Sequence, residues 1–452
     1  MNTLIILSIL GVAALFSEML NFKKAMLPLI LLGLVVALVA DVMAWNTNHH
    51  YYNEMMIVDN YSVAFTGLLI VITLLWFIIS PDFFHEPSSR SDHFALIIFA
   101  LIGGQVLTSY NNLLMLFLGI EILSIPLYIL AGSNKSDLSS NEASLKYFLM
   151  GAFATGFLLF GIALIYGVSG SFNLQAIAQS TTMSPMMIAG ITLMIVGLAF
   201  KVSAVPFHFW TPDVYTGSPT VIAAFMSTVV KTAAFAGFFR LFNSCFSTSS
   251  AIWSNTIWFL SAFTILLGNI TAVYQTNFKR MLAYSSIAHA GYMLLAILAM
   301  NKYAPGAILF YATAYSISSI TSFAILLVVS RITTNDSVKS FDGLAKRNPL
   351  LALATVFSML SLAGIPPMAG FFAKYYIFTA AVQQHYTGLV IIAVLGSLIG
   401  IFYYFRIIFS LFKSENEGVV FIMNPIFKSI LIVTSAATLL LGIMPQLIAG
   451  LL

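Results

Sequence analysis

Residues 197–213 have the sequence GLAFKVSAVPFHFWTPD, and residues 361–374 have the sequence SLAGIPPMAGFFAK. Each stretch starts inside a long apolar segment, meets proline, and carries a lysine beside the interruption: Lys201 in the first and Lys374 in the second. Proline lacks the backbone donor that a helix needs, and its ring clashes with the preceding turn. The two stretches therefore predict two broken helices, each with a lysine next to the break.

The composition of the whole chain is that of an integral membrane protein. Of its 452 residues, 60% are hydrophobic and only 8% are charged, whereas soluble domains carry about 25% charged residues. At about 30 residues per span and loop, the length allows roughly 12 to 15 helices and leaves no room for a soluble domain. The net charge of +4 is small and lies in loops, so it gives no indication of nucleic-acid binding.

Two further features narrow the class. The single cysteine, Cys245, excludes disulfides and cysteine-ligated iron–sulfur clusters within this chain. The N-terminus is apolar from Leu4 and lacks a basic region, so we expect a first transmembrane helix there and not a cleaved signal.

We expect an all-α integral membrane protein with about fourteen transmembrane helices, of which the seventh and the twelfth are broken. The seventh continues into a partly apolar extension at 205–216, which we expect to re-enter the membrane. The apolar segments long enough to span are 3–20, 26–44, 61–80, 94–110, 112–131, 141–166, 184–204, 219–241, 253–274, 281–300, 304–330, 350–383, 388–411 and 426–448.

The two breaks occupy equivalent places. Segments 4–8 and 9–13 have five spans each, and the broken segment is fourth in both sets. An odd number of spans forces two such units into opposite orientation, so the pattern predicts two inverted repeats with ion sites at the breaks. The predicted division is an N-terminal three-helix segment (1–93), the two repeats (94–242 and 253–411) and a C-terminal helix (412–452).

Positive charges in the short loops predict the orientation. With the N-terminus outside, the outer side holds only Lys302, with Arg240 at a helix end, and the loop 45–61 has no Lys or Arg. Both termini are therefore predicted on the outer side. The inner side then holds Lys23, Lys24, Arg90, Lys135, Lys279, Arg280, Arg331, Lys339, Lys346, Arg347 and Lys413, with Lys428 at its edge.

Five ionisable residues interrupt the apolar segments: Glu121, Lys146, Lys201, Lys231 and Lys374. An isolated charge in hydrocarbon costs about 3 kcal/mol or more. We interpret these residues as sites that hold and pass protons. Burial and a nearby opposite charge can shift the pKa of a carboxyl or ammonium group until it both binds and releases a proton.

Each of these residues also has a structural interpretation. Glu121 could be a neutral carboxyl held by one hydrogen bond, and Lys201 could snorkel to the inner surface. We expect instead that Glu121 and Lys201 pair across facing helices. Lys231 is nine residues from Arg240 and too deep to snorkel easily.

Lys146 is less deep. It follows residues 139–142, SSNE, which have the pattern of a capping box. It would lie only one or two turns inside, so snorkelling is an alternative for it.

His208 and His289 are secondary relay candidates. A single histidine on an apolar segment is also a common hydrogen-bonded core residue, so both interpretations stay open. Polar residues between 311 and 321 could hydrate a path beside them, or could simply bond neighbouring helices.

The order of these motifs resembles the antiporter-like subunits of respiratory complex I. It is most similar to the subunit-N type of the bacterial proton-translocating NADH–quinone oxidoreductase, over about residues 100–410. The stretches that carry the resemblance are 118–121 (LGIE), 142–153 (EASLKYFLMGAF), 200–215 (FKVSAVPFHFWTPDVY), 230–231 (VK), 277–292 (NFKRMLAYSSIAHAGY) and 361–367 (SLAGIPP) running to Lys374.

The resemblance implies roles for the five residues. Glu121 matches a glutamate that modulates Lys201, the lysine of the broken seventh helix. Lys231 matches a central lysine, and Lys374 matches a lysine near the outward exit. Lys146 matches a lysine typical of the subunit-N type.

The resemblance also implies partners and a location. NADH oxidation and quinone reduction would occur in other subunits, which would hold NAD, FMN, the iron–sulfur clusters and quinone, while this chain would hold no cofactor and no metal. The neighbours would be the antiporter-like subunit M and the small subunit K, with A, H, J and L in the same arm. The chain would lie in the bacterial inner membrane, in contact with lipid, with periplasmic termini.

Three alternatives stay open from the sequence. The chain could be a subunit of a multi-subunit Na⁺/H⁺ antiporter of the same superfamily, or a stand-alone secondary transporter of a small solute. It could also act only in assembly, in which case all five ionisable residues would tolerate neutral substitution.

Overall fold

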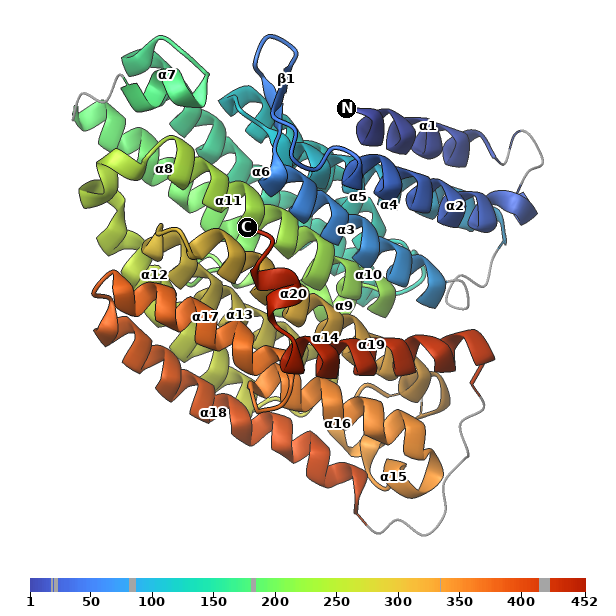
Figure 1. Cartoon of the computed structure of the whole chain (residues 1–452). Coiled ribbons are helices and arrows are strands. Elements are labelled where there is room, and N and C mark those ends of the chain that lie inside the picture. The colour runs from blue at the N-terminus through green and yellow to red at the C-terminus, as the bar shows by residue number, and fades with distance from the viewer. Residues whose placement is uncertain (18, 20–22, 81–86, 180–183, 334, 414–422) are drawn as a thin grey trace. The chain divides into compact units, whose positions relative to one another are not determined.

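The structure is a computed structural model, shown in Figure 1. It describes the chain except residues 18, 20–22, 81–86, 180–183, 334 and 414–422. The side chains of Lys23, Lys24 and Arg90, used above for the orientation, also lie outside the described part. Within that part, twelve helices are long and apolar enough to cross a membrane, and two apolar helices are shorter. The prediction of an all-helical membrane protein with about fourteen spans is confirmed.

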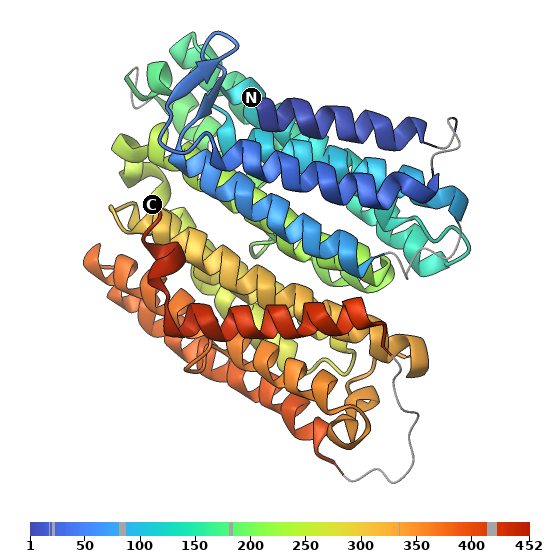
Figure 2. The same ribbon diagram turned by 45° about the vertical axis from the view of Figure 1, so that its right-hand side comes forward.

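The chain forms two compact units. The first comprises Met1–Val202 and Val229–Thr256. In it, α4 packs on α1 and α5, and α6 packs on α8; Figure 2 shows α1 and α2 running side by side. Its elements are α1 (Asn2–Phe16), α2 (Lys23–Val42), β1 (His49–Tyr51), β2 (Met56–Val58), α3 (Asn60–Ile79), α4 (Pro87–Ser109), α5 (Leu113–Ala131), α6 (Leu138–Ser169), α7 (Leu174–Gln179), α8 (Pro185–Val202), α11 (Lys231–Ser244) and η2 (Ser247–Ser249).

The second unit comprises Ser203–Thr228 and Ile257–Leu452. Its central helix is α14, which contacts α10, α13, α16, α17 and α19. The π-helical turn η1 (Met226–Val230) and α12 (Ser250–Val273) belong partly to each unit. The other elements are α9 (Trp210–Gly217), α10 (Thr220–Phe225), α13 (Phe278–Ala299), α14 (Ala304–Thr333), η3 (Val338–Phe341), α15 (Leu344–Arg347), α16 (Pro349–Ala363), α17 (Ala369–Gln383), α18 (Thr387–Leu411), α19 (Pro425–Ile443) and α20 (Gln446–Ala449).

A short hairpin interrupts the helical pattern between α2 and α3. Strands β1 and β2 pair antiparallel, with His49 opposite Val58. These strands are not predicted from the sequence, because three-residue strands give no periodic signal. The division into two inverted repeats stays a prediction.

The helix predicted to break in segment seven does break. Helix α8 ends at Val202, and Ser203 takes the left-handed conformation, with φ of 65°. In the second unit, the backbone N–H of Val205 donates to the Thr264 hydroxyl at 2.8 Å. Helix α9 then begins at Trp210, four residues after Pro206.

The helix predicted to break in segment twelve also breaks. Helix α16 ends at Ala363, where Gly364 has φ of 82° and closes the helix, and α17 begins at Ala369. The Ser361 hydroxyl accepts bonds from the Gly370 N–H at 3.2 Å and from the Ser318 hydroxyl at 2.8 Å. Side chains thus replace part of the hydrogen bonding that the break removes.

An ion pair joins two helix ends of the first unit, with the arginine buried and the aspartate partly exposed. The Arg240 guanidinium on α11 lies 2.7 Å from an Asp59 carboxylate oxygen, and the Arg240 side chain is 7% exposed. Asp59 also caps α3 by accepting from the Ser62 N–H. Burial alone would raise the pKa of Asp59, but the Arg240 charge and these hydrogen bonds outweigh it and hold the pKa below its ordinary value. Asp59 therefore stays charged and contributes stability that is lost only as the pH falls through that lowered pKa.

We expect Gly370→Ala to destabilise the second unit. A Cβ at Gly370 would lie 1.7 Å from the Ser361 carbonyl oxygen, a backbone atom that cannot move aside. The overpacking should cost about 3 kcal/mol, seen as a lower melting temperature of the detergent-extracted protein. Gly388→Ala is the control, because nothing lies within 4 Å of its Cβ. Equal melting temperatures for the two variants would contradict the close approach.

We expect Asp59→Asn to destabilise the first unit by about 3 kcal/mol, because it leaves the Arg240 charge buried without its partner. The control is Asp213→Asn. Asp213 pairs with Arg280 at 3.0 Å, but both side chains are more than a third exposed, and such pairs contribute about 0–1 kcal/mol. The same melting experiment measures both variants, and a loss for Asp213→Asn as large as that for Asp59→Asn would refute the assignment.

Candidate functional site

Lys201 is bound by two hydroxyls of a neighbouring helix. It lies in the last turn of α8 and is 5% exposed. Its ammonium donates to the Ser124 Oγ at 2.8 Å and to the Tyr128 hydroxyl at 3.2 Å, both on α5. Ser124 and Tyr128 are four residues apart, so they lie on one face of the helix. Two neutral acceptors thus replace part of the hydration that the ammonium loses on burial.

The direct Glu121–Lys201 pair expected from the sequence is absent, and that expectation is wrong for this conformation. Glu121 lies on α5 one turn before Ser124 and is partly buried. Its Oε1 atom is buried and has no hydrogen-bond partner. The hydroxyls further along α5 bind the ammonium instead, so one carboxylate oxygen remains available for another partner.

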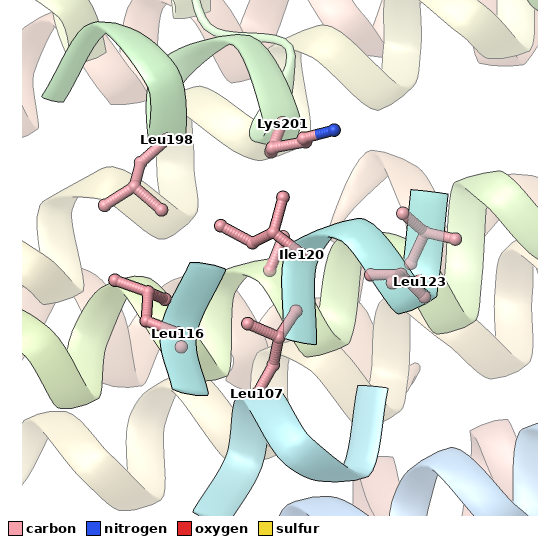
Figure 3. Close-up of a pocket in the computed structure, with 9 residues that line it drawn as sticks. Leu107, Leu116, Ile120, Leu123, Leu198 and Lys201 are labelled. Carbon is pink, nitrogen blue, oxygen red and sulfur yellow. The ribbon is translucent and has the colours of Figure 1, made fainter. Parts of the chain in front are cut away.

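A small apolar cavity lies beside Lys201 in the first unit (Figure 3). The cavity has a volume of about 10 Å³, which is enough for about one water molecule. Lys201 is the only ionisable residue among its walls, which are Leu107, Leu116, Ile120, Leu123, Leu198, Lys201, Val230, Ala234 and Gly237. An apolar cavity of this size favours the dry state.

Lys146 is not enclosed. It pairs with Glu142 at 2.6 Å, and the two side chains are 39% and 64% exposed. The capping box expected at 139–142 is not formed: Asp137 is the N-cap of α6 and accepts from the Ser139 N–H. The helix begins two residues earlier than the pattern indicates, so the Glu142 side chain can reach Lys146 one turn further on.

Lys231 is the first residue of α11 and is 1% exposed. It directly follows the π-helical turn Met226–Val230. Such turns are rare and are frequently found at functional sites. The sequence analysis does not predict this turn, although it places Lys231 deep in the membrane.

Lys374 reaches back to the break before it. Its ammonium donates to the Ala363 carbonyl at 2.6 Å and to the Ser397 hydroxyl of α18 at 2.7 Å, and the residue is 8% exposed. Ala363 is the last residue of α16, so its carbonyl has no partner within that helix. A positive charge at this helix end is favourable, and the break therefore supplies a binding site for the ammonium.

The two candidate histidines differ. His289 on α13 is buried, with Nδ1 2.7 Å from the Tyr311 hydroxyl and Nε2 3.1 Å from the Tyr404 hydroxyl. His208 lies in the segment between α8 and α9, and its buried Nδ1 has no hydrogen-bond partner. His289 is therefore part of a polar network, whereas one nitrogen of His208 is available.

Three polar residues of α14 bond neighbouring helices, while others bond the backbone of α14 itself. Tyr311 bonds His289, Tyr315 bonds Ser227 at 2.8 Å, and Ser318 bonds Ser361. Among the residues that the structure describes, no group of three or more His, Cys, Asp or Glu side chains could hold a metal ion.

The comparisons with known proteins agree on one family. Residues 110–400 match the family described as "NADH:quinone oxidoreductase/Mrp antiporter, TM". The chain is 46% identical to NADH-quinone oxidoreductase subunit N of Cytophaga hutchinsonii, over 99% of this chain and 98% of that protein.

Solved structures give the same result. A chain of respiratory complex I from Thermus thermophilus is 34% identical, with a TM-score of 0.86, over 99% of this chain and 98% of that one. A chain of the Mrp complex from Dietzia has the same TM-score at 22% identity, over 99% and 94%; it shows the fold alone. The chain therefore belongs to the NADH-quinone oxidoreductase subunit N family, and it is an antiporter-like, proton-translocating membrane subunit of respiratory complex I.

Proposed function

We propose that Glu121, Lys146, Lys201, Lys231 and Lys374 are the protonatable sites through which this subunit moves protons. The observation that carries the proposal is the burial of three lysines on separate helices: Lys201, Lys231 and Lys374 are each less than 9% exposed. A buried ammonium is costly, so its proton can be released when the surroundings change. His208 and His289 are secondary members of the relay.

The Lys201 site supports a switch between two bonding states. In the structure the ammonium is bound to Ser124 and Tyr128, and the Glu121 Oε1 is without a partner. Rotation of the lysine towards Glu121 would exchange two neutral acceptors for one charged acceptor, which favours the protonated amine. Return to the hydroxyls would make proton release easier. Electron transfer in other subunits would drive this exchange by moving charge or protein near Glu121.

The apolar cavity offers a second control point. It lies between Lys201 on α8 and Val230, the residue before Lys231. Proton transfer across apolar walls needs water, and the cavity has room for about one water. We infer that wetting of this cavity permits transfer from Lys201 towards Lys231, and that drying it prevents return. Lys374 would then release the proton near the outer side.

The exposed faces of α5 and α6 support the proposal of a protein partner. The exposed residues of the helices that carry Glu121 and the Lys146–Glu142 pair include large apolar ones, among them Ile125 at 51% and Phe153 at 73%. Ionisable groups that face lipid are costly, so we propose that another subunit covers part of this surface. Subunits M and K are the proposed neighbours, with A, H, J and L in the same arm.

The remaining assignments extend the same proposal. NAD, FMN, the iron–sulfur clusters and quinone would be held by partner subunits. The charge asymmetry of the loops supports a bacterial inner-membrane protein with both termini on the periplasmic side.

We expect Lys231→Ala to lower NADH-driven proton pumping by about half or more while the complex still assembles, because a non-ionisable side chain cannot hold the transferred proton. The measurement is dye quenching by reconstituted vesicles, normalised to the rate of NADH oxidation. Lys302→Ala, at an exposed outer loop position, is the control. Normal pumping by an assembled Lys231→Ala complex would refute the relay.

We expect Lys146→Met to lower pumping by about half or more as well, whereas Lys135→Met in an exposed inner loop should have no effect. Methionine retains the length and apolar stem of lysine but removes the charge. If Lys146→Met complexes assemble and pump normally, Lys146 is a surface lysine that snorkels and is not part of the relay.

A further inference from the structure

The second unit contains a series of buried hydrogen bonds and close polar contacts that runs from Lys374 to His289. On the Lys374 side, the ammonium donates to the Ser397 hydroxyl at 2.7 Å. Ser397 also lies close enough to the Tyr292 hydroxyl to interact with it. The Lys374 nitrogen lies 5.2 Å from the centre of the Tyr292 ring. These three residues form what we call the lysine cluster.

On the other side, the Tyr404 hydroxyl bonds Ser285 and lies 3.1 Å from Nε2 of His289. The Tyr403 ring packs on the Tyr404 ring with their centres 4.4 Å apart, and Tyr311 bonds Nδ1 of His289. We call this the histidine cluster. Its hydroxyl and imidazole groups can each accept a proton on one lone pair and release another, so they can pass protons among themselves.

The hydrogen bonds that join the two clusters run through Asn269 of α12, and the His289 and Tyr292 rings also lie 5.9 Å apart. The Asn269 Nδ2 donates to the Tyr292 hydroxyl at 3.0 Å and to the Ile265 carbonyl at 2.8 Å. Its Oδ1 accepts from the Tyr403 hydroxyl at 3.0 Å. The Ile265 carbonyl can only accept, so the nitrogen must face it, and this fixes the orientation of the amide.

The amide cannot relay a proton in the way its neighbours can. Its nitrogen has two hydrogens, both of which are donated, and it has no lone pair available for a proton from Tyr292. Tyr403 gives its single hydrogen to Oδ1, so it cannot at the same time donate towards Tyr404. Asn269 therefore connects the two clusters by hydrogen bonds, but its amide does not pass a proton from one cluster to the other.

The surroundings hold the amide in place. Asn269 is 2% exposed, and it packs against Gly396 and Gly400 of α18. A Cβ at Gly396 would lie 3.2 Å from Nδ2, and a Cβ at Gly400 would lie 3.1 Å from Oδ1. The absence of side chains at these two positions gives the amide its space on α18, and α18 leaves little room for a water beside it.

We propose that Asn269 is a proton barrier between the histidine cluster and the lysine cluster. This inference rests on the proposed function, because a barrier matters only where protons move. Asn269 is a positioning residue: it holds Tyr292 and Tyr403 at fixed places and prevents direct proton exchange between them. Passage to Lys374 then requires a change of conformation or a transient water, which keeps a proton released at Lys374 from flowing back.

The test replaces the amide by groups that can relay protons. Asn269→Asp retains the shape and adds a titratable oxygen in place of the nitrogen. Asn269→Ser places a hydroxyl there and frees space for a water. Asn269→Leu removes the polar bridge without supplying a relay and is the control.

Each variant is assembled in the complete complex, which is purified and reconstituted in vesicles. A potassium diffusion potential then drives protons inward without NADH, and an internal pH dye measures the passive proton conductance. The Asp and Ser variants should raise this conductance by about tenfold or more, a modest fraction of what a positioned acid–base group contributes. The Leu variant should leave it unchanged.

Unchanged conductance in the assembled Asp or Ser variant would overturn the barrier. An equal rise in the Leu variant would overturn it as well, because loosened packing would then be the cause. If the Asp variant does not assemble, the Ser variant decides. The outcome is separable from that of the relay, since Lys231→Ala tests pumping driven by NADH, whereas this experiment measures conductance in its absence.

Discussion

A buried ammonium group needs acceptors that water no longer supplies, and this constraint organises the chain around its two helix breaks. At the second break the helix end and the lysine satisfy each other. An unpaired buried carbonyl costs about 1–3 kcal/mol, and a lysine at membrane depth costs about 3 kcal/mol or more. The bond from Lys374 to the Ala363 carbonyl removes part of both costs. The turn at Gly364 and the close approach of Gly370 to Ser361 hold this geometry.

The two lysines beside the breaks are held by different kinds of acceptor, with different consequences. Lys374 is bound to a backbone carbonyl, whose position is fixed by the helix. Lys201 is bound to two side-chain hydroxyls, which can rotate and can also donate. The Lys201 site is therefore the easier one to rearrange, and the partnerless Oε1 of Glu121 is the acceptor that a rearrangement would use. A nearby change in charge or conformation would therefore alter the hydrogen bonds of Lys201 more easily than those of Lys374.

The sequence predicted features that depend on neighbouring residues in the chain. Apolar segments predicted the spans, and proline with glycine predicted the breaks at 206 and 366, because both effects act within a few residues. It did not predict that Ser124 and Tyr128 bind Lys201, or that Arg240 pairs with Asp59. Those partners are 73 to 181 residues apart, and no local pattern carries such information.

The sequence also led to a wrong prediction where two candidate N-cap residues lie close together. Residues 139–142 have a valid capping pattern, but Asp137 caps the helix two residues earlier. The π-helical turn before Lys231 has no sequence signature, because the extra residue is accommodated by packing around the helix.

The exposure of the ionisable residues divides them into two groups. Lys201, Lys231 and Lys374 are enclosed by this chain, whereas Glu121 is only partly buried and Lys146 is 39% exposed. Lipid cannot solvate the charges of Glu121 and Lys146 at membrane depth, whereas polar groups of a partner subunit can solvate them. A charge that moves in that partner would act first on these two accessible residues. Little water lies between them, so their electrostatic interaction is weakly screened. In the proposed relay the enclosed lysines would respond through these two residues, so the division of exposure would set the order in which a signal from a partner subunit reaches the proposed sites.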